Sequence, residues 1–166
     1  MKYILLVLLL FGFSACGYTP SSKFSRQITG EKISTSVVIS SQDPENTVLI
    51  KDALDGAILE VFNASLTTRK ESKTHLEISI LSIKYTPVQY DKDGYVVAYR
   101  TSIGLQIKRV TDSKKKSYIG YGMYDFSIVA NAVVTDQERF DAIRSSAVKA
   151  IKSFVAQVSA EGARSK

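Results

Sequence analysis

Few side chains in this sequence are of types that could carry out covalent or acid–base chemistry. The chain has one cysteine, Cys16, and one histidine, His75, so neither can belong to a Cys/His cluster. Asp91 and Asp93 are paired carboxylates, but they stand in a stretch whose Asp and Gly residues favour a tight turn. His75 lacks a partner nearby in sequence, and we interpret it as an exposed or half-buried imidazole. The sequence contains no HExxH, no GxSxG and no phosphate-cradling loop, so we expect no enzyme, no cofactor and no metal site.

Cys16 stands where an exported protein is processed. Lys2 is followed by an apolar block over 3–13 and then by the small residues Ser14 and Ala15, which is the order of an export signal. The apolar block is about half of the ~20 residues that span a bilayer, so a permanent transmembrane helix is the weaker interpretation.

The Phe-Ser-Ala-Cys sequence over 13–16 resembles the bacterial lipobox, in which cleavage leaves the cysteine first and its thiol carries a diacylglycerol. Phe13 stands where that motif usually has Leu. The alternative is an ordinary secretory signal followed by a free cysteine, but a lone reactive thiol in an exported protein would then need explaining. We therefore expect a signal peptide over 1–15 and acylation of Cys16, because multiple acyl chains give firm anchoring. The absence of Asp at Gly17 favours, by resemblance to bacterial lipoproteins, sorting to the outer membrane.

The composition is that of one globular domain with a basic surface. After residue 15 about 150 residues remain, which suits one domain with an apolar core. With 45% hydrophobic and 23% charged residues the chain is not of the disordered class, and with one cysteine it can form no internal disulfide. The net charge of +6 favours anionic partners: phospholipid headgroups, lipopolysaccharide phosphates or an acidic protein surface. Nucleic acid is not expected, since no RNA- or DNA-binding signature occurs.

Apolar periodicity predicts four strands and two helices. We expect a polar tether over 16–31, the domain itself over 32–160 and a polar tail over 161–166. The predicted elements are a strand over 32–40, a helix from Asp43 to about Phe62, strands over 76–89, 96–110 and 117–130, and a helix that begins with a capping box, Thr135 and Glu138.

This order predicts an α+β fold, specifically a two-layer sandwich of order βαβββα. Its four-stranded sheet is mainly antiparallel and has two helices on one face. The first helix connects the first two strands, and the crossover is expected to be right-handed if these strands are parallel. The residues expected to face the core are Leu49, Ala53, Ala57 (or Ile58) and Val61 on the first helix, Tyr99, Thr101, Ile103, Leu105 and Ile107 on the third strand, and Phe140, Ile143, Ala147, Ile151, Phe154 and Val158 on the last helix.

The sequence Cys-Gly-Tyr-Thr-Pro over 16–20 resembles the CGY(x)P opening of the LptE family of lipopolysaccharide-assembly lipoproteins, and the order of predicted elements is similar to that family's. The resemblance implies an outer-membrane lipoprotein that sits as a plug inside an LptD β-barrel, assists the assembly of that barrel and helps insert lipopolysaccharide into the outer leaflet. It also implies contact with the phosphorylated sugar head of the lipid. The alternative is a pilot or chaperone lipoprotein for another outer-membrane complex, such as a secretin.

Contact with lipid phosphates would need Lys or Arg on a firm element or loop. The alternative for the Lys-rich turn over 114–116 is that its lysines keep the turn solvated and protect the edge of the sheet. The alternative for Arg100 is a cross-strand ion pair. The lipopolysaccharide-binding candidates are Arg100, Lys108, Arg109, Lys114, Lys115 and Lys116.

Three tyrosines in one short stretch are candidates for partner contact, because Tyr is enriched at interfaces. Tyr118 and Tyr124 share one parity and Tyr121 has the other, so at least one face of this strand is expected to be core. Plain packing is the alternative for these side chains.

Overall fold

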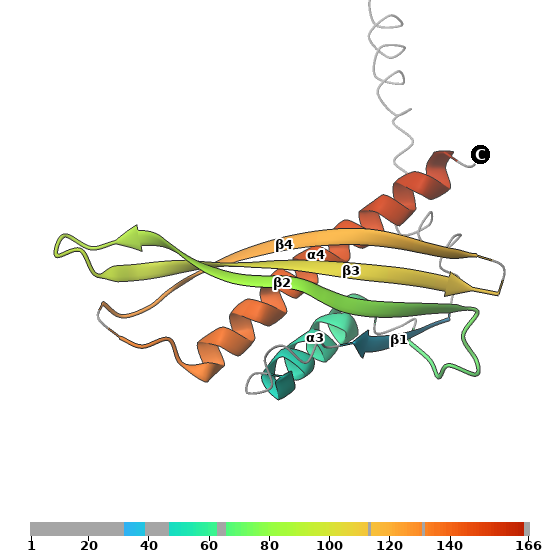
Figure 1. Ribbon diagram of the computed structural model, residues 1–166, viewed down its shortest axis with the longest axis horizontal. Helices are drawn as coiled ribbons and strands as arrows, with labels where there is room; N and C mark the ends of the chain where they lie inside the picture. Colours follow the sequence, from blue (N-terminus) through green and yellow to red (C-terminus); the bar gives the residue numbers. More distant parts are fainter. Residues whose placement is uncertain (1–31, 39–46, 63–65, 113, 131, 165–166) are drawn as a thin grey trace, which may run out of the picture.

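The structure, a computed structural model, describes residues 32–38, 47–62, 66–112, 114–130 and 132–164. The elements in chain order are β1 (Ile33–Val38), α3 (Thr47–Phe62), β2 (Thr74–Tyr90), β3 (Val96–Thr111), β4 (Lys115–Ser127) and α4 (Asp136–Arg164). The strands form one sheet in the order β1-β2-β3-β4, in which β1 is parallel to β2 and the other neighbours are antiparallel. Both helices lie on one side of this sheet (Figure 1), which confirms the predicted α+β fold of order βαβββα.

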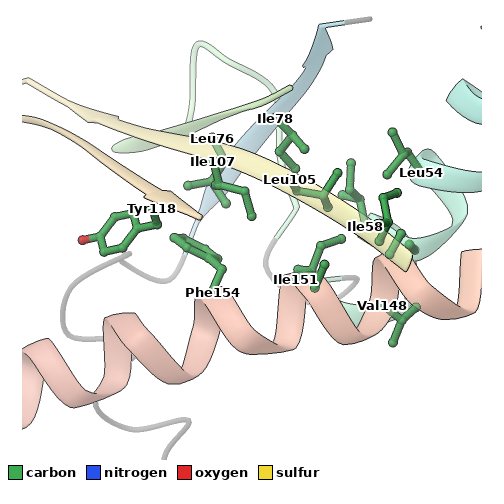
Figure 2. Close-up of a cluster of buried hydrophobic side chains, with 14 of the residues drawn as sticks. Leu54, Ile58, Leu76, Ile78, Leu105, Ile107, Tyr118, Val148, Ile151 and Phe154 are labelled. Atoms are coloured by element: carbon green, nitrogen blue, oxygen red, sulfur yellow. The ribbon is translucent and has the colours of Figure 1, made fainter. Parts of the chain in front are cut away.

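The hydrophobic core lies between the sheet and the two helices. Ile103, Leu105 and Ile107 on β3 are almost fully buried. Figure 2 shows Leu105 and Ile107 facing Ile151 and Phe154 on α4. Burying apolar surface of this kind is the main favourable contribution to folding. The core also includes, from the other elements and the rest of α4, Ile33, Leu76, Ile78, Ala53, Leu54, Ala57, Ile58, Ile143, Ala147, Val148 and Val158.

The helix faces agree with the apolar stripes of the sequence, with one addition on α3. Ala53 and Ala57 are buried as expected, and Leu49 and Val61 are half-buried. Leu54 is also fully buried, so α3 turns a wider face toward the core than three- and four-residue spacing alone indicated.

A tight turn and a capping box fix the ends of the long elements. The Asp91 carboxylate accepts hydrogen bonds from the backbone amides of Asp93 and Tyr95, at 2.9 and 2.8 Å, and Gly94 has a φ of 85°. At the start of α4, the Glu138 carboxylate accepts from the Thr135 amide at 2.8 Å, while the Glu138 amide donates to the Thr135 hydroxyl at 3.2 Å. Both predicted features are confirmed.

Two glycines allow α4 to approach β4 with its backbone. A Cβ on Gly120 would overlap the carbonyl oxygen of Ala150, and a Cβ on Gly122 would overlap that of Ser146. The residues of α4 at this contact also have small side chains. They are Ser146, Ala147 and Ala150, and all three are fully buried. The inner face of β4 therefore carries backbone-to-backbone packing where a larger side chain would hold the helix away.

The pairing of β2 with β3 shifts register between Ile80 and Ser82, so Leu81 is an inserted residue at a β-bulge. Before the bulge the even-numbered residues of β2 face the helices. After it, as far as the next register shift at Pro87, the odd-numbered residues do, because one extra residue reverses the alternation. Ile83 and Tyr85 thereby come to the inner face, opposite Ile103 and Thr101 of β3.

Several expectations about boundaries differ from the structure or lie outside it. The last helix continues to Arg164, so that residues 161–164, expected as part of a polar tail, are helical. The Glu161 carboxylate accepts hydrogen bonds from β4, described below, and these stabilise the extra turn. The signal peptide, Cys16, the tether and the helix cap at Asp43 lie outside the described residues.

Candidate functional site

A cluster of charged side chains around Glu161 joins β3, β4 and α4 at one end of the molecule. The Tyr118 hydroxyl and the Lys116 ammonium each donate to Glu161 Oε2 at 2.7 Å. The Arg109 guanidinium lies 3.7 Å from Glu161 Oε1. Arg109 reaches this position because it continues the inward-facing row of β3 beyond Ile107.

The two cations of this cluster also lie against an aromatic ring. Arg109 and Lys116 are 5.8 and 5.4 Å from the centroid of the Tyr118 ring, which packs edge-on against Phe154. In Figure 2 the Tyr118 ring stands at one end of the core, with its hydroxyl pointing away from the apolar side chains. A cation that is 91% buried would be costly alone, but here the side chain of Arg109 has a carboxylate and a ring as partners.

The pKa values in the cluster follow from these contacts. Burial, followed by the hydrogen bond to Glu161, raises the pKa of Tyr118 to about 12. The hydrogen bonds from Lys116 and Tyr118 lower the pKa of the Glu161 carboxyl, so this group is ionised at neutral pH. The cluster is therefore a fixed arrangement of one anion, two cations and a protonated hydroxyl.

Further basic side chains surround this cluster. Lys114, Lys115 and Lys116 are exposed residues in the turn from β3 to β4 and at the start of β4. An open hollow of about 670 Å³ is lined by Lys116, Glu161 and Arg164 among others. Since the five basic side chains outnumber the carboxylates of Glu161 and Asp112, this end of the molecule is suited to an anionic group. We refer to Arg109, Lys114, Lys115, Lys116 and Arg164 as the basic end.

Arg100 and Lys108 lie apart from the basic end, on the outer face of β3. Arg100 donates from Nε and Nη2 to both oxygens of Asp125 on β4, at 2.7 and 2.8 Å. This pairing raises the pKa of Arg100 and lowers that of Asp125. Lys108 donates to Glu77 on β2 at 3.0 Å. The cross-strand ion pair considered for Arg100 is thus confirmed, and both candidates have a carboxylate partner.

The three candidate tyrosines of β4 divide between its two faces. Tyr118 is buried and Tyr124 is half-buried on the inner face, where the Lys149 ammonium lies 5.5 Å from the Tyr124 ring. Tyr121 is 64% exposed on the outer face, and its ring lies across Gly104 of β3. The expectation that one face of this strand belongs to the core is confirmed.

The outer face of the sheet carries polar side chains and one apolar row. The row consists of Ile119, Tyr121 and Met123 on β4, which are 45%, 64% and 53% exposed. The ion pairs of Arg100 and Lys108 lie beside this row. Neither α3 nor α4 covers this face, since both pack against the inner residues.

His75 is on β2, opposite Ser34 of β1, and its side chain is on the same outer face. Its Nδ1 and Nε2 are each 2.9 Å from a serine hydroxyl, those of Ser34 and Ser36. Burial, followed by the nearby charge of Arg69, lowers the pKa of His75. The half-buried, hydrogen-bonded imidazole agrees with the interpretation made from the sequence.

The described part of the chain offers neither a metal site nor a membrane-spanning helix. Over those residues no three His, Cys, Asp or Glu side chains are grouped so that they could hold a metal ion. Neither α3 nor α4 is long and apolar enough to cross a membrane.

Sequence reasoning missed Glu161, which organises the basic end. Its segment was expected to be a polar tail, and nothing in that segment alone indicates that α4 brings it to Arg109 and Lys116. The i, i+3 and i, i+4 spacing from Phe154 through Val158 to Glu161 was the available signal, because it places Glu161 on the buried stripe of the helix.

The model of the lipopolysaccharide-assembly family LptE matches residues 34–158 of this chain. Among solved structures, one from Caulobacter crescentus CB15 described as a lipoprotein has 11% identity and a TM-score of 0.53, covering 88% of this chain and 96% of that chain. Rare lipoprotein B from Shewanella oneidensis has 12% identity and a TM-score of 0.39, covering 80% and 92%. PelC from Paraburkholderia phytofirmans has 10% identity and a TM-score of 0.43, covering 77% and 90%. None of the curated proteins matches the chain.

Proposed function

The chain belongs to the lipopolysaccharide-assembly family LptE, and we propose that it is an outer-membrane lipoprotein that plugs an LptD-like β-barrel. In this proposal Cys16 carries the lipid anchor, and the domain faces the periplasm and enters the partner barrel. There it assists the assembly of the barrel and helps insert lipopolysaccharide into the outer leaflet.

The observation that carries the proposal is the outer face of the sheet. A plug inside a transmembrane barrel must present a mainly polar surface, because the lumen of such barrels is polar. The outer face offers two ion pairs that are already formed, at Arg100–Asp125 and Lys108–Glu77, so docking would not leave these four charges without a partner. The apolar row with Tyr121 at its centre supplies the aromatic contact that interface cores favour.

Co-purification of the full chain from detergent-solubilised outer membranes tests the proposal. We expect recovery of a large lipopolysaccharide-exporting barrel, and recovery of a secretin without such a barrel would contradict it. Tyr121→Glu should reduce the recovery of the barrel at least tenfold, because a charge would enter the apolar row. Leu59→Glu, at a 54% exposed position on α3, is the matched control and should leave recovery unchanged. Equal loss in both variants would reject the outer face as the docking surface.

For lipopolysaccharide we propose contact at the basic end. Lys114 and Lys115 are exposed, while the cluster around Glu161 holds Lys116 and Arg109 in fixed positions. Charge-assisted hydrogen bonds of this kind suit lipid phosphates. Arg100 and Lys108 each have a carboxylate partner of their own, whereas Arg109 and Lys116 share the single carboxylate of Glu161, so we rank Arg100 and Lys108 second.

Neutralising the lysines tests this contact. In the full chain, Lys114→Gln, Lys115→Gln and Lys116→Gln combined should weaken lipopolysaccharide binding at low salt, and the difference should shrink at high salt. Lys152→Gln, an exposed position on α4, is the control. Unchanged binding of the triple variant at both salt concentrations would remove the patch from the proposal.

The lipid anchor has a test of its own. Mass spectrometry of the mature N-terminus should show Cys16 as the first residue, with its thiol carrying acyl chains. Labelled palmitate should enter the protein, and Cys16→Ser should abolish the incorporation. A protein that took up no palmitate and appeared in the soluble periplasmic extract would overturn the whole account.

A further inference from the structure

A second cavity lies at the other end of α4, between the sheet and the beginnings of both helices. Its volume is about 470 Å³, within the range of pockets that bind small ligands. Arg139 in its wall is 22 residues from Glu161 along α4, so the two ends are on the order of 30 Å apart. The cavity is therefore separate from the basic end. Its apolar walls include Leu49 and Ile50 of α3 and Ile83 of β2.

The cavity exists because of the β-bulge at Leu81. The extra residue turns Ile83 and Tyr85 toward the helices, at a part of the sheet where α3 and α4 begin. Figure 1 shows the hairpin of β2 and β3 extending past the start of α4, so the inner face there is only partly covered. Apolar side chains consequently line a space that neither described helix fills.

Two polar side chains lie among these apolar walls. The guanidinium of Arg139 is half-exposed, and its contact with Asp136 is long, at 4.0 Å, to a carboxylate that is 85% exposed. Tyr85 supplies a hydroxyl, and burial raises the pKa of this group, so it remains a hydrogen-bond donor at neutral pH. A loosely paired cation and a donor beside an apolar cavity form a binding site of amphipathic character.

We propose that this cavity binds an acyl chain of a phosphorylated lipid. The apolar walls take the chain, and Arg139 and Tyr85 take the phosphate where the cavity opens to water. An apolar chain without a charged head would give the Arg139 guanidinium no anionic partner. A free phosphate would leave the apolar walls in contact with water. Lipopolysaccharide and glycerophospholipids share this chemistry. The inference deepens the proposed function, on which it rests for the presence of lipopolysaccharide.

Photo-cross-linking in intact cells tests the site with the full chain. A benzoylphenylalanine residue replaces Val134, which lines the cavity. The matched control carries it at Val133, which is 84% exposed and is not part of the wall. We expect a lipid adduct at position 134 and at least tenfold less at 133. If the variant at 134 is not recovered folded, a second probe at Ile50 on α3, which also lines the cavity, tests the same site.

The charge requirement has its own variant. Arg139→Gln should lower the adduct yield about tenfold, because it removes charge-assisted hydrogen bonds to the phosphate, whereas Lys152→Gln on the same helix should not.

An adduct mass that matches lipid A and one that matches a glycerophospholipid both support the site, and each identifies the source of the lipid. Adducts with protein only, equal yields at 133 and 134, or yields unaffected by Arg139→Gln would overturn it. Loss of the adduct with the barrel still recovered rejects only the cavity, and an adduct without any barrel rejects only the plug function.

Discussion

The Tyr118 hydroxyl donates to the Glu161 carboxylate at 2.7 Å, across 43 residues of sequence. This bond connects β4 to the last turns of α4 and fixes the carboxylate between Arg109 and Lys116. The basic end is therefore rigid on both the sheet side and the helix side. Its charges are placed by tertiary structure as well as by the Lys-rich turn.

Loss of this bond should be visible at alkaline pH. The pKa of Tyr118 is about 12 in the folded protein against about 10 ordinarily, so the folded state holds its proton more tightly. Its contribution to stability is complete below pH 10 and disappears as the pH rises toward 12. Urea unfolding between pH 9 and 11 should show stability falling, and Tyr118→Phe should flatten that fall. Tyr121→Phe, at an exposed position, should leave that fall unchanged. Identical pH dependence of stability in the two variants would contradict the assignment of the alkaline loss to Tyr118.

Removing the carboxylate should cost more than removing one of its cations. Glu161→Gln leaves Arg109, whose side chain is 9% exposed, with a neutral amide in place of its ion-pair partner. We expect a loss of about 1–3 kcal/mol in the free energy of unfolding, the range for hydrogen bonds to charged groups. Lys116→Gln, whose side chain is 51% exposed, should cost clearly less. Chemical denaturation measures both variants, and a larger loss for Lys116→Gln would be inconsistent with this arrangement.

Gly122→Ala should destabilise the packing of α4 on β4. The added methyl group would overlap the carbonyl oxygen of Ser146. This oxygen belongs to the backbone of α4, so it can move away only if the helix shifts. Overpacking of this kind costs about 1–3 kcal/mol, and thermal unfolding will show it. Gly104→Ala is the control on the neighbouring strand, since its methyl group meets the side-chain atoms of Ser82 and Tyr121 at 3.1 Å. If both variants unfolded at the same temperature, the close helix approach would be wrong.

The protein should lose stability on mild acidification through His75. The folded state lowers the pKa of this imidazole from its ordinary 6.5, so the unfolded chain takes up the proton first. Stability contributed by the neutral ring is present above pH 6.5 and is lost as the pH falls toward the folded-state pKa. Unfolding free energies at pH 7.5, 6.5 and 5.5 should decline in the parent protein. The unfolding free energy of the His75→Gln variant should decline less over this range. A steeper decline in the variant would contradict the role of His75.

The sequence predicted the parts of the fold that local patterns specify. Alternation along β3 correctly placed Ile103, Leu105 and Ile107 inside, and the Thr135 capping box marked the start of α4. Both signals arise within a few residues, because side-chain direction and helix capping are local properties.

The features that were not predicted depend on pairing between distant segments. The inserted residue Leu81 shows no local signature, and it reverses which side chains of β2 face the helices, so the cavity beside Tyr85 could not be anticipated. Glu161 acquires its role only when α4 lies across β4. Candidate residues such as Lys116 could be identified by type, but their partners could not.

The parallel pairing of β1 with β2 has a consequence for the order of folding. Ser34 of β1 lies opposite His75, 41 residues away, whereas β2, β3 and β4 are joined by short turns. Loop closure disfavours distant contacts early, so the three-stranded meander is expected to form first and β1 to add last. Until it does, the free edge of β2 is open to other strands. A nascent chain thus passes through an interval in which shielding by a chaperone would matter most.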